Sequence, residues 1–260
     1  MGSVQPVVLR GRPRLPSLKT KVQSSQPSGY NGRKCEGAEP EIPRDCHLTI
    51  GSVNIGLMSG RSGEVVEMVA RRRLDFCCIQ ESRWKGEGAR LLGGEGKRYK
   101  FFWKGCKEGT AGVGIFVAEQ YIDNVVEVRR VSERVLVLRV TIGKGVLNLV
   151  TAYAPQVGRS SEEKEEFCVL MGKMMAEISE SEKLVVIGDM NGHVGERADG
   201  FECIHGGMGF GERNLEGEML LEFAEATDFI VGNTWFKKEV TKRVTYQSGE
   251  CRSQIDYVLV

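Results

Sequence analysis

Short apolar runs rich in β-branched and aromatic residues recur along most of this chain, and they constrain its fold more than any other feature. Such runs are typical of β-strands when glycine-containing turns separate them. We expect ten strands, at 47–56, 74–82, 99–105, 111–119, 134–143, 145–155, 184–189, 229–235, 243–247 and 253–260. Many strands that do not alternate strictly with helices favour two packed sheets with helices outside them.

Three further segments have the apolar spacing of amphipathic helices, at 62–73, 160–179 and 215–228. The second begins behind Ser and Glu residues, which favour the start of a helix. Arginines end the first, where cations suit the negative end of the helix dipole. The predicted fold class is therefore α/β.

The first 46 residues differ in composition from the rest of the chain. They hold six of its seven prolines, and eight Lys or Arg against four Asp or Glu, which gives 8 − 4 = +4. Proline, serine and basic residues without apolar periodicity predict a disordered, basic arm at 1–46. Such an arm could contact phosphates or could be an incidental leader. We expect the folded domain at 47–260.

Bulk composition is that of a soluble globular protein, with 41% hydrophobic and 27% charged residues. No apolar run approaches the roughly 18 residues of a membrane span, and the N-terminus lacks the apolar core of a signal peptide. The eight cysteines have no metal-site spacing, which favours reduced thiols. We expect a nuclear or cytoplasmic monomer that is not secreted and has no membrane partner.

Polar residues stand at the ends of several predicted strands: Asn54, Glu81, Tyr153, Asp189 with Asn191, and Asp256. In "LVVIGDMNGHVG" (184–195) the pair Asp189 and Asn191 has two interpretations. The pair could form a turn, which these residue types favour locally. It could also form part of an active site, which open α/β sheets place at strand carboxyl ends. Because five strands end this way, we expect an oxygen-rich pocket where those ends meet.

Such a pocket suits Mg²⁺, which takes oxygen ligands from one or two carboxylates and keeps waters. Glu81 is the best candidate metal ligand, with Asn54 beside it. Asp189 could orient or deprotonate an attacking water, while Asn191 and Tyr153 could donate hydrogen bonds to developing phosphate charge. The sequence has neither a Walker-type phosphate loop nor a Gly-x-Ser-x-Gly elbow. This pattern favours hydrolysis of a phosphate ester by water.

Six motifs in this order resemble the endonuclease/exonuclease/phosphatase family: "SVNIG", "CIQES", "TAYAPQ", "VVIGDMNGHVG", "GERNLEG" and "SQIDYVLV". "GERNLEGEMLLEFA" and "GNTWF" resemble most the endonuclease domains of LINE-type non-LTR retrotransposons. The resemblance implies a four-layer α/β sandwich, with two mostly antiparallel sheets flanked by helices. It also implies DNA as the partner and Mg²⁺, with Mn²⁺ as a substitute, as the cofactor.

The resemblance also implies roles for individual residues. Glu81 and Asn54 would hold the metal, and Asp189 would activate the water. Asn191 and Tyr153 would contact the scissile phosphate. Two further residues are Asp256, which would orient a histidine from the following strand, and Asn214, which would bind substrate.

The sequence departs from the family pattern at its end, where Val260 comes before the expected Ser/Gly-Asp-His strand. We therefore expect the last strand to be missing, Asp256 to lack its partner, and a sheet edge to be exposed. The histidines at 47, 193 and 205 are expected to be loop residues without a catalytic role. The chain would then be a fragment of a longer protein or a gene remnant that no longer cuts.

Three functions follow as hypotheses. The first is a retrotransposon-derived, Mg²⁺-dependent phosphodiesterase that nicks DNA and is impaired by loss of the Asp-His motif. The alternative is a non-catalytic nucleic-acid- or protein-binding remnant, and the third is an inositol-phosphate phosphatase. "FKKEVTKRVTYQ" (236–247) is expected to form a hairpin whose cations contact DNA or are simply solvated.

Overall fold

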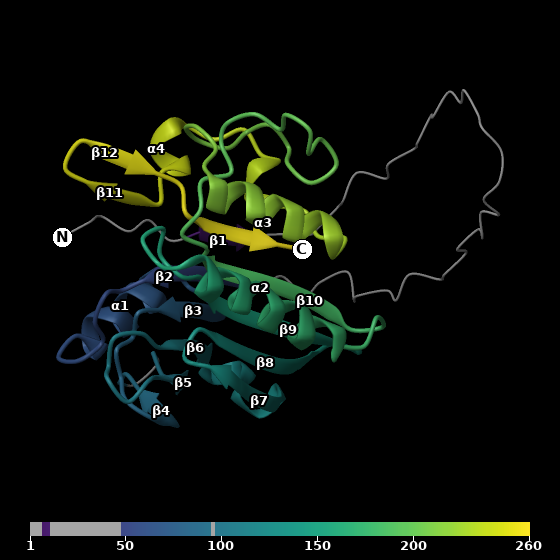
Figure 1. The fold of residues 1–260 in the computed structure, drawn as a ribbon. Coiled ribbons are helices and arrows are strands. Elements are labelled where there is room, and N and C mark those ends of the chain that lie inside the picture. The colour runs from purple at the N-terminus through teal and green to yellow at the C-terminus, as the bar shows by residue number, and fades with distance from the viewer. Residues whose placement is uncertain (1–6, 11–47, 95–96) are drawn as a thin grey trace.

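The computed structural model describes residues 7–10, 48–94 and 97–260. Two main sheets lie against each other, and helices cover their outer faces (Figure 1). The first sheet has the order β1 (Val7–Arg10), β2 (Thr49–Asn54), β3 (Phe76–Gln80), β6 (Val113–Ala118), β5 (Tyr99–Lys104) and β4 (Glu87–Leu92). The second has the order β13 (Asp256–Leu259), β10 (Lys183–Asp189), β9 (Gly145–Tyr153), β8 (Val135–Ile142) and β7 (Val125–Ser132). The predicted α/β class with two sheets flanked by helices is confirmed.

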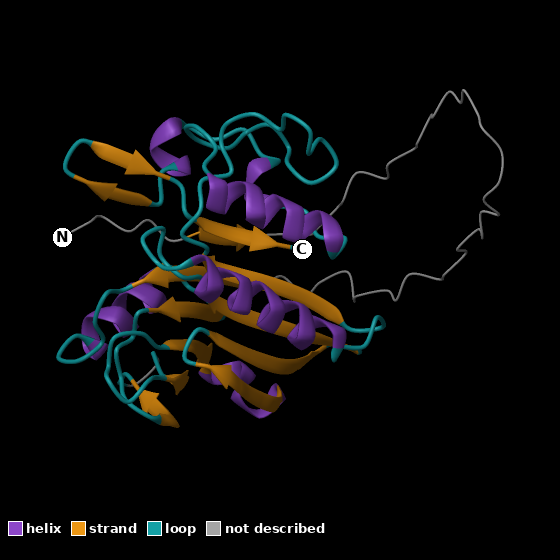
Figure 2. Ribbon diagram, viewed as in Figure 1, coloured by secondary structure: helices purple, strands orange, loops and turns teal. Residues whose placement is uncertain are grey.

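The three long helices of the described chain agree with the sequence prediction to within a few residues at each end (Figure 2). They are α1 (Ser62–Arg71), α2 (Ser161–Ala176) and α3 (Leu215–Ala226). Ser160 and Asn214 cap the last two, because their side-chain oxygens accept backbone N–H groups of the first turn. None of the helices in the described ranges is long and apolar enough to cross a membrane.

Alternation along the strands divides the apolar side chains into three layers of core. On β8, Leu136 and Leu138 face the other sheet, whereas Val135 and Val137 face the helices. Successive strand residues point to opposite faces, so one strand supplies two layers. Helix α1 covers the first sheet, while α2 and α3 cover the second. Helix, sheet, sheet and helix make the four layers that the resemblance implies.

Two parallel strand pairs bring the polar strand ends together. Strands β2 and β3 are parallel, and so are β9 and β10, while the other pairs within the main sheets are antiparallel. The carboxyl ends of parallel strands meet at one edge of a sheet. Strand β13 runs antiparallel to β10, so its first residue, Asp256, lies opposite Asp189, which is itself opposite Tyr153.

Four predictions made from the sequence were wrong in detail. Strands β4 and β7 were missed, because β4 is largely exposed and β7 carries charged residues between its apolar ones.

The run at 229–235 forms a single bridge at Val231 and a 3-10 turn, η2 (Gly232–Thr234). The predicted hairpin at 236–247 is instead helix α4 (Val240–Arg243), and the hairpin follows as β11 (Tyr246–Ser248) and β12 (Cys251–Ser253) (Figure 2). Another 3-10 turn, η1 (Glu119–Asn124), precedes β7.

The outer edge of β13 is not exposed, contrary to prediction. Ile230 and Val260 exchange backbone hydrogen bonds of 2.9 and 3.2 Å. The Asn233 side chain donates to the Asp256 carbonyl at 3.0 Å and accepts from Val258 N at 3.2 Å. A side-chain amide carries the same donor and acceptor as a peptide group, so Asn233 takes the place of a neighbouring strand.

The N-terminal segment predicted as a disordered arm is described over four residues only. Val7–Arg10 form β1, which pairs antiparallel with the free edge of β2 instead of remaining unstructured. Backbone hydrogen bonds to that edge supply an ordering interaction that composition does not reveal. The rest of the arm, and His47, lie outside the described residues.

We expect Gly188→Ala to destabilise the fold by about 1–3 kcal/mol, the range for overpacking a core. A Cβ at Gly188 would lie 1.9 Å from the Ala152 carbonyl oxygen on the neighbouring strand β9. Urea unfolding followed by circular dichroism measures the effect. The matched control is Gly145→Ala, whose Cβ would meet only Ile142 O, at 3.9 Å. A Gly188→Ala variant as stable as this control would contradict the prediction.

Candidate active site

Polar side chains from both sheets meet at the carboxyl ends of β2, β3, β9 and β10. Asn54 ends β2, Glu81 directly follows β3, Tyr153 ends β9 and Asp189 ends β10. The sequence predicted this grouping, and a continuous set of hydrogen bonds joins the four side chains. Strand direction therefore explains why residues up to 135 positions apart in sequence are neighbours.

Asn54 is one of two links between the sheets at this site, beside the bond from the Tyr153 hydroxyl to Glu81. Its Nδ2 donates to Glu81 Oε1 at 3.1 Å and to Asp189 Oδ2 at 3.0 Å. Its Oδ1 accepts from Gly56 N at 3.0 Å. One neutral amide thus holds two carboxylates close together and offsets part of their mutual repulsion. The role of Asn54 as a metal ligand stays a prediction.

Glu81 is held as an ionised carboxylate. Burial raises its pKa, but hydrogen bonds from Tyr153, Asn54 and Arg83 outweigh burial and leave the pKa below its usual value. The Tyr153 hydroxyl donates to Oε1 at 2.6 Å, and the Arg83 guanidinium lies 2.9 Å from Oε2. Glu81 has a φ of 52°, a left-handed conformation that costs a non-glycine residue about 1–3 kcal/mol.

The turn after β10 confirms the local interpretation of Asp189 and Asn191, while their place in an active site stays a prediction. Asp189 Oδ1 accepts from Asn191 N at 3.0 Å, a local bond typical of Asp-initiated turns. Asn191 has a φ of 48°, and its Nδ2 donates to Ala154 O at 2.8 Å. Burial raises the pKa of Asp189 to about 6, while bonds from Asn54 and Asn191 lower it and the charge of Glu81 raises it. The turn is thus the means by which Asp189 is presented to the site.

Asp256 and Asn214 border this group. Asp256 is buried opposite Asp189, and burial together with the Asp189 charge raises its pKa. Its Oδ1 has no hydrogen-bond partner in the described part of the chain. Asn214 Oδ1 accepts from Gly217 N at 2.9 Å and from His193 N at 2.8 Å. Asn214 therefore ties the start of α3 to the loop that follows Asn191, and its contact with substrate stays a prediction.

Both described histidines lie in loops, as predicted. His193 follows the Asp189 turn, and its backbone bonds to Asn214. His205 is buried, and its Nδ1 accepts from Gly207 N at 3.0 Å while Nε2 lies 3.1 Å from Gly195 O. Burial lowers the pKa of His205, which favours the neutral ring. Its hydrogen bonds assign it to the loop structure.

Three residues of the site were missed from the sequence. Arg83 pairs with Glu81, and its position in "QESR" was the available signal. Arg134 lies over the Tyr153 ring, 5.2 Å from the centroid, and donates to the carbonyls of Tyr153 and Ala154. Gln156 Nε2 contacts the Tyr153 hydroxyl at 3.4 Å. Arg134 comes from the turn before β8, so only the packed sheet shows its contact with Tyr153.

The donor set fits a hard divalent cation. Glu81 supplies an ionised carboxylate, and the Asp189 carboxylate shares the same amide donor. No group of three or more His, Cys, Asp or Glu side chains within the described ranges could hold a metal. Magnesium needs only one or two carboxylates, since water and substrate phosphate complete its octahedron. The residues present therefore fit a divalent cation that is bound through one or two carboxylates.

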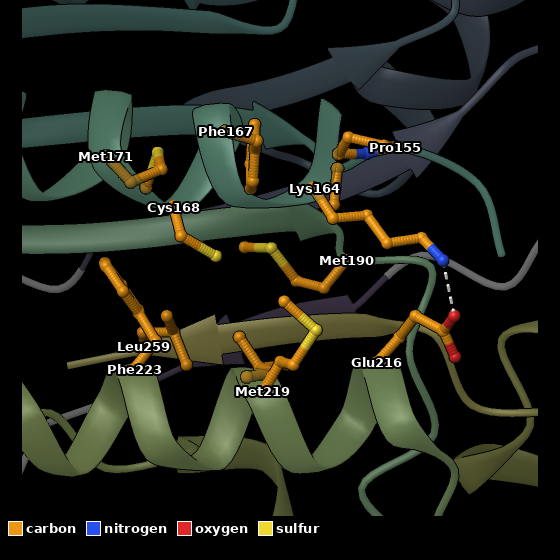
Figure 3. Close-up of a pocket in the computed structure, with 12 residues that line it drawn as sticks. Pro155, Lys164, Phe167, Cys168, Met171, Met190, Glu216, Met219, Phe223 and Leu259 are labelled. Atoms are coloured by element: carbon orange, nitrogen blue, oxygen red, sulfur yellow. Dashed lines mark hydrogen bonds and ion pairs between the residues drawn. The ribbon is translucent and has the colours of Figure 1, made fainter. Parts of the chain in front are cut away.

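An apolar pocket of about 50 Å³ lies between α2 and α3, and Met190 lines it (Figure 3). Met190 points into it and meets side chains from both helices, while its chain neighbours Asp189 and Asn191 bond to the polar site. The Lys164–Glu216 ion pair of 2.8 Å closes one end. Packing of Met190 against the two helices therefore anchors the turn. Asn54, Glu81 and Asp189 do not line this pocket.

The comparisons with known proteins agree with this geometry. Residues 51–260 match the model of the Endonuclease/Exonuclease/phosphatase family, and the chain belongs to that family. The fold is similar to the endonuclease domain of TRAS1, a telomere-specific non-LTR retrotransposon, with 14% identity and a TM-score of 0.54 over 81% of this chain and 83% of that one. It is also similar to the 3'-5' exonuclease NExo from Neisseria meningitidis, with 16% identity and a TM-score of 0.57 over 81% and 86%.

In sequence, the chain is similar to craniofacial development protein 2 of Bos taurus, with 24% identity over 248 residues. That alignment covers 94% of this chain and 41% of the relative. The Tragulus javanicus protein of the same name is 24% identical over 213 residues, which cover 81% and 36%. The chain thus spans less than half the length of these relatives. The family resemblance that the six motifs carry is confirmed.

We expect Tyr153→Phe to raise the pKa of Glu81, because the variant loses the 2.6 Å hydrogen bond to Oε1. Carbon-detected NMR titration of the Glu81 carboxyl measures the change. A lowered folded-state pKa gives stability that is present above the unfolded pKa and lost as pH falls through the folded-state value. The difference in unfolding free energy between parent and variant should therefore shrink on acidification.

The control for this titration is Tyr246→Phe, at an exposed tyrosine of the β11–β12 hairpin. It should leave the Glu81 titration unchanged. If Tyr153→Phe also leaves that titration unchanged, the Tyr153 hydroxyl does not support the Glu81 charge.

Proposed function

We propose that this protein is a Mg²⁺-dependent phosphodiesterase that nicks DNA. The observation that carries the proposal is the joining of Glu81, Asn54 and Asp189 across two sheets by one amide nitrogen. An ionised carboxylate for a metal and a buried carboxylate for a water are thereby fixed close together. Hydrolysis of a phosphate diester by water is accelerated by a base that accepts the proton of the water and by a metal ion that stabilises charge on the phosphate oxygens.

Glu81 would hold the metal, with Asn54 beside it. The ion, when bound, supplies Lewis-acid stabilisation of negative charge on the phosphate oxygens. The chain's part is to keep Glu81 ionised, through hydrogen bonds from Tyr153, Asn54 and Arg83. Mn²⁺ should substitute for Mg²⁺, because both accept carboxylate and water ligands.

Asp189 would accept the proton of the attacking water at its carboxylate. A pKa of about 6 leaves most of this group ionised at neutral pH and makes it a stronger base than an exposed Asp. Bonds from Asn54 and Asn191 N fix the orientation of its two oxygens. Asn191 and Tyr153 would contact the scissile phosphate. Asn191 Nδ2 keeps a second proton beside its bond to Ala154 O, and the Tyr153 hydroxyl would transfer its hydrogen bond from Glu81 to the phosphate.

The comparisons support DNA as the substrate and a retrotransposon origin. TRAS1 is a non-LTR retrotransposon, and a NExo structure is described as bound to a product DNA hairpin. Three lysines beside and within helix α4, Lys237, Lys238 and Lys242, add cations that suit contact with phosphates. On this proposal the protein acts as a monomer in the nucleus or cytoplasm.

The alternative is a non-catalytic domain that binds nucleic acid or protein. The observation that favours it is the Asp256 carboxylate, whose Oδ1 is buried without a partner in the described chain. A site with an incomplete hydrogen-bond network could retain a binding surface while it lacks hydrolytic activity. Both candidates predict a folded protein, so nicking activity separates them.

Asp189→Asn should lower the rate of nicking of supercoiled plasmid by at least about 100-fold, the size of a general-base contribution. Glu81→Gln should also lower it strongly, because it removes the carboxylate that would hold the metal. Each change removes a charge from the site and preserves side-chain size. Chelation of divalent ions with EDTA should abolish nicking by the parent chain. Gel electrophoresis of relaxed and supercoiled plasmid measures these rates.

Asp123→Asn is the matched control, because Asp123 is exposed on η1, which packs against the opposite ends of the strands. It should nick at the parent rate. Parent-like activity in Asp189→Asn would remove the proposed base. A folded parent chain that binds plasmid without nicking it in Mg²⁺ or Mn²⁺ would establish the binding alternative.

A further inference from the structure

The two oxygens of Glu81 have different partners. Oε1 accepts from the Tyr153 hydroxyl at 2.6 Å and from Asn54 Nδ2 at 3.1 Å. Oε2 accepts from Arg83 at 2.9 Å. Internal neutral donors therefore occupy Oε1, and a cation occupies Oε2.

Backbone hydrogen bonds fix the loop that carries Arg83, which is the more exposed partner of this ion pair. Ser82 N and Arg83 N donate to the carbonyls of Gly112 and Ala111 at 2.9 and 3.1 Å. Glu81 and Arg83 both have a φ of 52°, a left-handed conformation that is uncommon for residues other than glycine. The side chain of Glu81 is 13% exposed and that of Arg83 is 46% exposed. A cation that approaches Oε2 from solvent therefore meets the Arg83 guanidinium.

Arg134, at the same site, has more contacts that hold its guanidinium in place than Arg83 has. Its guanidinium stacks on the Tyr153 ring and donates to the carbonyls of Tyr153 and Ala154. The guanidinium of Arg83, by contrast, is paired with Glu81 Oε2 from an exposed position. Because the Arg83 partner of this ion pair is exposed, water can compete for the guanidinium and the pair can open.

We propose that Arg83 is an internal counter-cation, which must leave Glu81 Oε2 before a divalent ion can bind there. This inference rests on the metal site of the proposed function. In the metal-free protein, Arg83 neutralises Glu81 and protects the site from carboxylate repulsion with Asp189. The same contact lowers the affinity of the site for a divalent ion, because the ion competes with the guanidinium for one oxygen.

The test is a titration of the full chain with Mn²⁺ in the absence of DNA, with free ion measured by electron paramagnetic resonance. Arg83→Gln should bind Mn²⁺ about two- to fivefold more tightly than the parent, the range for loss of an exposed ion pair. Arg83→Lys should bind close to the parent value, because competition depends on charge. Thermal unfolding verifies that each variant is folded.

Arg98→Gln is the matched control for net charge. Arg98 also pairs with a glutamate, Glu119, and its side chain is 48% exposed. It should leave the Mn²⁺ affinity unchanged, apart from the small effect of one distant charge. Arg83→Gln binding no tighter than Arg98→Gln would overturn the inference.

Glu81→Gln separates this inference from the proposed function. If Mn²⁺ binding by the parent depends on Glu81 but does not change in Arg83→Gln, the metal site stands and the counter-cation role is wrong. If Mn²⁺ binding does not depend on Glu81, the metal site itself is wrong and the inference is overturned with it.

Discussion

A chain of buried hydrogen bonds crosses between the two sheets one layer beneath the candidate site. Ser52 Oγ donates to Gln80 Oε1 at 3.2 Å, and Gln80 Nε2 donates to Thr151 Oγ1 at 3.0 Å. All three side chains are completely buried. Polar groups without water must be paired, so one residue of slippage between the sheets would leave them unsatisfied. This requirement fixes the relative position of β2, β3 and β9, and the site lies at their ends.

That fixed position brings two carboxylates together at considerable electrostatic cost, and neutral or cationic donors offset the cost. Asn54 donates to both Glu81 and Asp189, and Tyr153 and Arg83 stabilise Glu81 further. The two carboxylates consequently differ: the pKa of Glu81 lies below its usual value and that of Asp189 above. Paired groups whose environments separate their pKa values are suited to different roles, one as a permanent charge and one as a base.

Much of the fold was accessible from the sequence because its strongest elements are locally encoded. The period-2 and period-3.6 patterns gave most strands and the three long helices, since burial of one face imposes that spacing. Elements that depend on a neighbour were missed or misassigned. Strand β4 is exposed and exists through pairing with β5, and the run at 229–235 closes the edge of β13 through Asn233 instead of forming a strand.

The sequence by itself determined which residue types would stand at the strand ends: Asn54, Glu81, Tyr153, Asp189 and Asn191 follow apolar runs that must be buried. Only the tertiary structure decided how these groups pair. The double contact of Asn54, the guanidinium of Arg83 on Oε2 and the stacking of Arg134 on Tyr153 depend on sheet packing and on left-handed loop residues. The periodicity of apolar residues in the sequence predicts the face of a strand or helix on which a side chain lies. The partner across the sheet is set by long-range register, which no local pattern encodes.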